Sequence, residues 1–185
     1  CYDVTFYDLN IEIDLDNKKI AGYVDFHALA VNDFTELQFD LAKNMILDEV
    51  NYKGKTLSYV REEDAVFVIF PKLTAGTHFQ FRVTYHGEPL VAKRPPWDGG
   101  FVWEKDKADR DFVAVACEGD GASLWWPCKD HPTEEPDSMA INITVPSDIM
   151  CVANGKLREK VETDVKTTYK WFVTKPINNY NVSVN

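Results

Sequence analysis

The fold is decided by residues 7–28, YDLNIEIDLDNKKIAGYVDFHA. Apolar and polar residues alternate over 7–15 and again over 20–28, and the polar run 16–19 separates the two. Strict alternation is typical of a strand with one buried face, because successive side chains of a strand point to opposite sides. A short polar turn between two such runs indicates a hairpin. The stretch therefore predicts two antiparallel strands that share one buried face.

The same period continues along most of the chain. It predicts further strands at 37–41, 45–52, 57–60, 65–70, 79–85, 112–117, 139–145, 165–173 and 180–184. No window of ten or more residues has apolar side chains at the helical spacing i, i+3, i+4 and i+7, so helices should be few and short. The sequence predicts an all-β, mostly antiparallel fold with turns spaced as in a β-sandwich.

Two segments interrupt the alternation. Residues 86–103 are rich in proline and glycine and contain Trp97 and Trp103, which predicts a long, ordered surface loop. Residues 112–117 are interpreted as a buried strand that leads into the stretch 117–138. That stretch should connect two core strands and be fixed at both ends.

The whole chain has 185 residues, 45% of them hydrophobic, which predicts a single domain over 1–185. Its formal net charge of −10, without clusters of Lys or Arg, argues against nucleic acid and against an anionic membrane surface. No apolar run reaches the roughly 20 residues of a membrane span. The charge would instead attract a cationic group such as the free amino terminus of a peptide.

Both ends of the chain lie inside strand-like alternation, and we interpret the chain as a domain taken from a longer protein. The sequence shows no signal region before the first strand pattern, and a periplasmic or extracytoplasmic location and a cytoplasmic location are both left open.

Reactive side chains show no catalytic or metal-binding spacing. The four histidines lie in separate elements without a His-Glu-x-x-His pair, and no serine has the nucleophile-elbow pattern. The cysteines also lack a Cys-x-x-Cys pair and are Cys1, Cys117, Cys128 and Cys151. No metal site is expected in this chain. A bridge between Cys117 and Cys128 is left open.

The stretch 117–132, CEGDGASLWWPCKDHP, favours a binding corner. Gly119 and Gly121 flank Asp120, so the backbone can adopt positive φ and bend just after Glu118. Such a bend would leave the carboxylate of Glu118 facing a cleft. A solvated or turn-capping carboxylate is the alternative.

Two tryptophans and a proline follow this bend. Trp125 and Trp126 would anchor the corner, one toward the core and one toward a neighbouring surface, while Pro127 fixes the exit of the chain. The alternative is that both tryptophans simply pack in the core.

Residues 117–139, CEGDGASLWWPCKDHPTEEPDSM, resemble the signature of the amino-terminal domain of the zinc aminopeptidases of the gluzincin clan, the family of aminopeptidase N and leukotriene hydrolase. Residues 2–14 resemble that family's opening strand, and 96–103 and 176–181 resemble its bacterial members. The resemblance implies a β-sandwich or saddle that packs on a thermolysin-like catalytic domain following residue 185. Zinc would be bound by that domain, and this chain alone should be inactive.

The resemblance also assigns a substrate contact. In that family the residue after the first cysteine of the motif is a Gln or Glu that holds the free α-amino group of the peptide substrate, and this position is Glu118. Gly119 and Asp120 are further candidates for the same site. The role of Asp120 is open between a second contact to the amine and electrostatic repulsion of Glu118.

Two other functions are compatible with the residues. The chain could be a free-standing β-sandwich that binds a glycan or a protein through Trp97, Trp103, Trp125 or Trp126. It could also be a scaffold that orders a neighbouring domain, with Glu118 only capping a turn.

Overall fold

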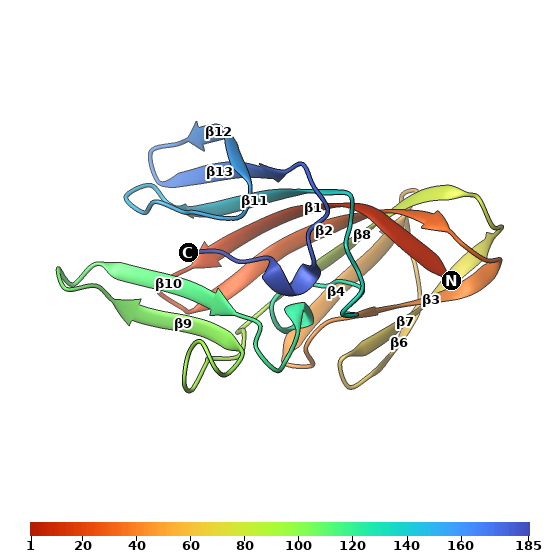
Figure 1. The fold of residues 1–185 in the computed structure, drawn as a ribbon, viewed down its shortest axis with the longest axis horizontal. Coiled ribbons are helices and arrows are strands. Elements are labelled where there is room, and N and C mark those ends of the chain that lie inside the picture. Colours follow the sequence, from red (N-terminus) through yellow and green to blue (C-terminus); the bar gives the residue numbers. More distant parts are fainter.

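The computed structural model describes residues 1–185 as three β-sheets with two single turns of 3₁₀ helix (Figure 1). The elements are β1 (Tyr2–Asp14), β2 (Lys19–Ala30), β3 (Phe34–Asp40), β4 (Met45–Tyr52), β5 (Lys55–Thr56), β6 (Tyr59–Glu62), β7 (Ala65–Leu73), β8 (His78–Gly87), β9 (Gly100–Lys105), β10 (Asp111–Ala116), η1 (Ala122–Leu124), β11 (Ser138–Pro146), β12 (Lys156–Glu162), β13 (Lys166–Val173) and η2 (Asn179–Asn181). The predicted all-β class is confirmed, and the only helices are these two turns.

The hairpin predicted from residues 7–28 is confirmed. β1 and β2 pair antiparallel, with Tyr7 opposite Phe26 and Leu9 opposite Val24, and all four side chains are buried. Because the paired residues share one face, the hairpin presents a continuous apolar surface to the interior.

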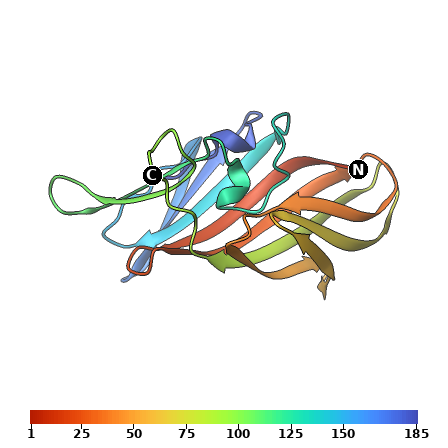
Figure 2. The same ribbon diagram turned by 90° about the horizontal axis from the view of Figure 1, so that it is seen from below.

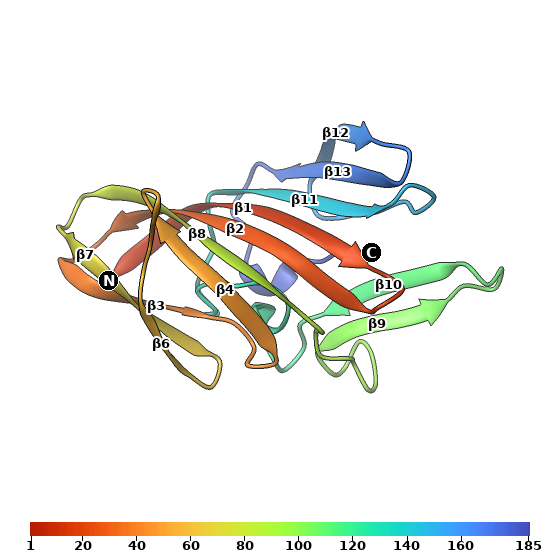
Figure 3. The same ribbon diagram turned by 180° about the vertical axis from the view of Figure 1, so that it is seen from behind.

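β1 and β2 lie in the middle of an eight-stranded sheet, in the order β12-β13-β11-β1-β2-β8-β4-β5. Figure 3 shows the long strands of this sheet side by side. Every neighbouring pair is antiparallel except β1 and β11, which run parallel. The mostly antiparallel arrangement is therefore confirmed. One face of the sheet is apolar, and the other carries polar pairs such as the two-point ion pair of Arg82 with Asp25.

The small sheet β3-β7-β6 covers the apolar face at the end of the molecule that carries the N-terminus (Figures 1 and 2). Phe39 and Phe70 of this sheet pack on Phe26 and Phe81 of the large sheet, with ring centroids 5.7 Å apart for Phe26 and Phe39 and 5.4 Å apart for Phe70 and Phe81. Two facing layers with interleaved aromatic rings make this part a sandwich.

The remaining apolar face is covered by the connection between β10 and β11. Trp125 and Trp126 of this connection are both 0% exposed, and the ring of Trp126 meets that of Tyr7 edge-on at 5.0 Å. The expectation that one tryptophan faces a neighbouring surface is wrong. The connection between β10 and β11 packs directly on the large sheet, and both rings fill the core.

The third sheet, β9 with β10, is a two-stranded arm at the opposite end from the N-terminus (Figure 1). Residues 100–103 begin β9, so the predicted loop 86–103 is shorter than expected and spans 88–99. β10 was expected to be a buried core strand, which is wrong: it pairs only with β9, and Phe112 is 46% exposed. Alternation identified the strand but not whether a second layer covers it.

The other strand predictions hold less well toward the end of the chain. Residues 180–184 do not form the predicted strand; they contain part of η2 and a single bridge between Val184 and Ala153. The lysine- and glutamate-rich edge strand β12 was not predicted. The strand expected at 57–60 begins at Tyr59, as β6. None of the helical turns has the length and apolar character that a membrane-spanning helix needs.

Candidate functional site

Glu118 lies on a tight turn directly after β10. The backbone N–H groups of Asp120 and Gly121 both donate to the carbonyl oxygen of Cys117, at 3.3 and 3.0 Å. Gly119 and Gly121 have φ angles of 79° and 82°, so the predicted glycine-dependent bend is present. The side chain of Glu118 is exposed on the outside of this turn.

The loop 88–99 lies directly against the same turn. A Cβ atom on Gly99 would lie 2.6 Å from Oδ2 of Asp120 and 2.9 Å from the backbone oxygen of Glu118. Only a glycine permits this approach, so Gly99 helps to set where the turn lies. Sequence reasoning predicted an ordered loop here but not this contact.

Asp130 holds the turn from the other side. Its Oδ2 accepts a hydrogen bond from the backbone of Ser123 at 2.8 Å, and a Cβ atom on Gly121 would lie 2.3 Å from the same oxygen. The backbone of Asp130 donates to Oδ2 of Asp40 at 3.1 Å. Asp40 and Cys128 also form an isolated antiparallel bridge, so the corner is attached to the end of β3.

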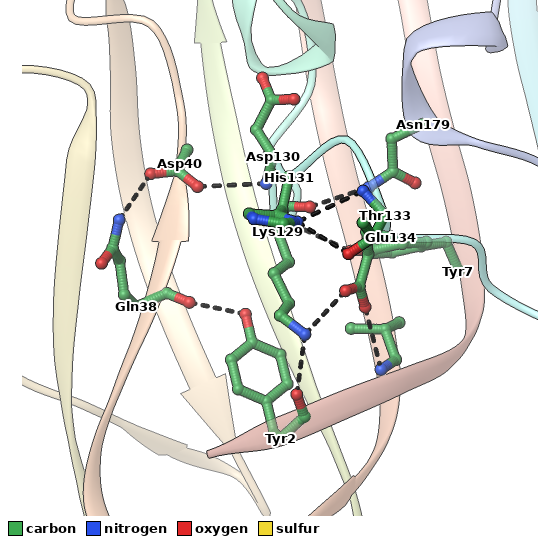
Figure 4. A network of polar contacts seen from close by, with 11 residues as sticks. Tyr2, Tyr7, Gln38, Asp40, Lys129, Asp130, His131, Thr133, Glu134 and Asn179 are labelled. Carbon is green, nitrogen blue, oxygen red and sulfur yellow. Dashed lines mark hydrogen bonds and ion pairs between the residues drawn. The ribbon is translucent and has the colours of Figure 1, made fainter.

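A second group of contacts ties the corner to the start of β1 (Figure 4). Nζ of Lys129 lies 2.7 Å from Oε2 of Glu134 and donates to the carbonyl oxygen of Tyr2 at 2.9 Å. Glu134 is only 6% exposed, and its other carboxylate oxygen accepts from the backbone of Val4 at 3.3 Å. The buried charge of Glu134 is thus paired and hydrogen-bonded, as a buried carboxylate requires.

The three predicted support residues lie beneath the turn. Trp125, Trp126 and Pro127 are all buried, and the hydroxyl of Tyr85 donates to the backbone oxygen of Trp125 at 2.9 Å. They fill the core behind the corner, and their support of a binding site stays a prediction.

The exposure of the tryptophans bears on the alternative function, a free-standing β-sandwich that binds a glycan or a protein through tryptophan side chains. Trp125 and Trp126 present no face to solvent, and Trp103 stacks on Phe101 with ring centroids 5.1 Å apart. Trp97 alone among the four candidates is strongly exposed, at 76%.

Tyr180 is the residue of the corner that sequence reasoning missed. It lies on η2, which contacts η1 of the corner (Figure 1), and its hydroxyl donates a hydrogen bond to Oε2 of Glu118. This hydrogen bond to the carboxylate raises the pKa of the Tyr180 phenol. The available signal was the run of asparagines before Tyr180, because Asn favours the start of a helical turn over a strand.

The cysteines near the corner are free and buried. Burial raises the pKa of the Cys117 thiol to about 11 and holds the pKa of Cys128 well above its ordinary value. The Cys117–Cys128 bridge that the sequence left open is not formed. Neither thiol has the lowered pKa of a cysteine nucleophile.

No group of three or more His, Cys, Asp or Glu side chains is arranged to hold a metal ion. A groove of about 910 Å³ lies on the polar outer face of the large sheet beside Asp25, His27 and Arg82. An apolar cleft of about 80 Å³ lies between Phe112 and Val184. Glu118 lines neither of these two, and its side chain is exposed on a surface turn.

Solved structures with a similar fold include an M1 zinc metallopeptidase and yeast LTA4 hydrolase. An M1 zinc metallopeptidase from Deinococcus radiodurans superposes with a TM-score of 0.81 at 19% identity, over 99% of this chain and 41% of that one. A mutant of that enzyme bound to the substrate Tyr-Ser-Ala gives a TM-score of 0.83 at 21% identity, and it is likewise covered over 41% of its length. Yeast LTA4 hydrolase gives 0.77 at 19% identity, over 99% of this chain and 28% of that one.

At these identities the superpositions establish the fold, and this chain spans less than half of each of those proteins. A family model described as the Peptidase M1 N-terminal domain matches residues 4–180. The chain therefore belongs to the Peptidase M1 N-terminal domain family, which confirms the resemblance drawn from residues 117–139. No curated protein sequence matches it.

Proposed function

We propose that this chain is the non-catalytic amino-terminal domain of a zinc-dependent aminopeptidase. It would pack on the catalytic domain of the same protein and use Glu118 to hold the free α-amino group of a peptide substrate. Membership of the Peptidase M1 N-terminal domain family supports the first part, together with the partial coverage of two-domain metallopeptidases. The observation that carries the second part is the carboxylate of Glu118, which is held on a glycine-dependent turn and exposed to solvent.

The chemistry of the carboxylate suits an amino terminus. An α-ammonium group has a pKa of about 7.7–8.0 in a free peptide, so it is mostly charged at neutral pH, and its N–H groups form strong hydrogen bonds to a carboxylate. Oε2 of Glu118 accepts from Tyr180, which leaves Oε1 for a ligand. An internal peptide bond has no ammonium group, so such a contact would select cleavage at the amino end.

The residues of this chain do not fit a zinc site, because no cluster of ligating side chains is present. Zinc would be bound by the catalytic domain and would supply the hydrolytic chemistry there. The role proposed for this chain is limited to binding and orienting the amine and to forming one wall of the cleft. The loop 88–99, which contacts the Glu118 turn and exposes Trp97, is the part of the surface best placed to form that wall.

Substitution of Glu118 tests this proposal in the full-length protein. Hydrogen bonds to charged groups contribute about 1.5–3 kcal/mol, so Glu118→Ala should lower kcat/KM for an aminoacyl substrate roughly 10- to 150-fold. Glu135→Ala is the matched control, because Glu135 is an exposed acid of the same connection. Steady-state kinetics showing an unchanged kcat/KM for Glu118→Ala would reject the assignment.

A further inference from the structure

We infer that Tyr180 is a positioning residue for Glu118: its hydroxyl fixes one carboxylate oxygen so that the other is presented to the substrate's amine. The inference rests on the proposed function of Glu118. It extends that function to a residue 62 positions further along the chain, on a different element.

The backbone that carries Tyr180 is held firmly. The side chain of Asn178 caps η2 by accepting from the backbone of Tyr180 at 3.0 Å, and its Nδ2 donates to the carbonyl oxygen of Pro132 at 2.6 Å. Asn179 is 1% exposed, and its Nδ2 donates to the carbonyl oxygen of Lys129 at 3.0 Å. Two amide side chains therefore fasten the turn of Tyr180 to residues 129–132.

The turn that carries Glu118 is fastened to the same segment. Asp130 accepts from Ser123 and lies against Gly121, and Lys129 is anchored by Glu134. The backbone turns that carry Tyr180 and Glu118 are thus both attached to residues 129–132. The contacts that attach them do not include the hydrogen bond between the two side chains. The fold therefore sets the relative positions of the two backbone segments from which these side chains extend.

The hydrogen bond gives an exposed glutamate a fixed orientation. A free glutamate side chain loses rotamer freedom when it binds a ligand, and this loss weakens binding. A carboxylate accepts hydrogen bonds at both oxygens, so the phenol can occupy Oε2 while Oε1 stays available to an ammonium group. Tyr180 would therefore improve amine binding by reducing this cost in advance.

The test compares Tyr180→Phe with the wild type in the full-length protein, using aminoacyl substrates. Removing the hydroxyl should raise KM roughly 2- to 10-fold and change kcat less than twofold, because only the ordering of the amine-binding carboxylate is lost. In a Glu118→Ala background, which has no side-chain acceptor for the phenol, the same change should have no further effect on KM. Tyr59→Phe is the matched control: Tyr59 is 39% exposed, like Tyr180 at 44%, and its hydroxyl donates to the backbone of Leu47 instead.

The outcomes separate the inference from the proposed function. If Glu118→Ala weakens the kinetics but Tyr180→Phe leaves KM unchanged, Tyr180 has no positioning role while the function of Glu118 stands. If Tyr180→Phe acts equally with and without Glu118, its effect is not transmitted through this carboxylate and the inference is wrong. If Glu118→Ala itself changes nothing, both are overturned.

The pKa of the Tyr180 phenol is a second measurement, and a general loss of protein stability would not change it in the same way. With ring-labelled tyrosine, the NMR signal of Tyr180 is identified as the one missing from Tyr180→Phe. Its pKa should lie above the ordinary value of about 10 in the wild type and fall toward 10 in Glu118→Gln. An identical titration of this signal in the two proteins would show that the hydroxyl does not bond to Glu118.

Discussion

Asp40 is the carboxylate through which the corner is most directly coupled to pH. Burial raises its pKa, and this rise is opposed by the hydrogen bonds from Nε2 of Gln38 and from the backbone of Asp130. The negative charges of Asp130 and Asp64 raise the pKa further. The folded protein therefore binds this proton more tightly than the unfolded chain does, whose Asp pKa is about 3.9.

Asp40→Asn should change how the free energy of unfolding depends on pH, in comparison with the wild type. Because the pKa is raised in the folded state, ionised Asp40 costs stability, and this cost is absent below about pH 4 and grows as the pH rises through the folded-state pKa. The free energy of unfolding of Asp40→Asn minus that of the wild type should therefore increase between acid and neutral pH, because only the wild type carries the cost of the ionised carboxylate. Urea denaturation at a series of pH values measures it, and a constant difference across the series would contradict the assignment.

The turn between Cys117 and η1 contains two glycines with positive φ but different surroundings. Gly119 has a φ of 79° and open space where a side chain would project. Gly121 has φ and ψ of 82° and 179°, a conformation that is essentially confined to glycine, and a side chain there would meet Oδ2 of Asp130 at 2.3 Å. Alanine at position 121 therefore meets both backbone strain and close packing, whereas alanine at position 119 meets backbone strain alone.

Alanine substitution at each position should reveal this difference. Gly119→Ala should cost about 1–2 kcal/mol of stability, because only the left-handed conformation is disfavoured. Gly121→Ala should cost roughly a further 1–3 kcal/mol, because its backbone conformation is essentially confined to glycine and because Asp130 must move, which strains its hydrogen bond to Ser123. Denaturant unfolding of the two variants measures the difference, and equal losses would contradict this account of the turn.

The elements were predictable where a strand is half buried. β1, β2, β4, β8 and β11 alternate because the large sheet has one apolar and one polar face, and alternation is a property of each strand by itself. β10 alternates as well, yet no second layer covers it, and that fact depends on the rest of the molecule. β12 is an edge strand with a charged sequence, so it has too few apolar residues to be recognised.

In the candidate site, too, the features set by adjacent residues were predictable and the contacts between distant segments were not. Glu118 and its bend follow from adjacent residues, since the glycines that permit the turn are next to the carboxylate in the sequence. The contacts of Gly99 and Tyr180 with this turn join segments that are distant in the sequence, and a single sequence carries no pattern that pairs them. The burial of both tryptophans likewise depends on which face the connection covers.

The molecule as a whole is an open two-layer β-domain whose candidate site projects outward. The apolar face of the large sheet is covered partly by the small sheet and partly by the connection that carries Trp125 and Trp126, and Glu118 lies on the outer side of that connection. The Glu118 carboxylate is exposed, and it lines neither the groove on the outer face of the large sheet nor the apolar cleft beside Phe112. Under the proposed function, the catalytic domain would supply the second surface of an amine-binding cleft.

The central claim is that Glu118 contacts the amino group of a bound substrate, and a crystal structure of the full-length protein with a bound amino acid tests it most directly. We expect a Glu118 carboxylate oxygen about 2.7–2.9 Å from the α-nitrogen of the ligand, the distance of a charge-assisted hydrogen bond. An amino acid bound at the metal centre, with the Glu118 carboxylate in solvent and outside hydrogen-bonding distance of the α-nitrogen, would contradict the account.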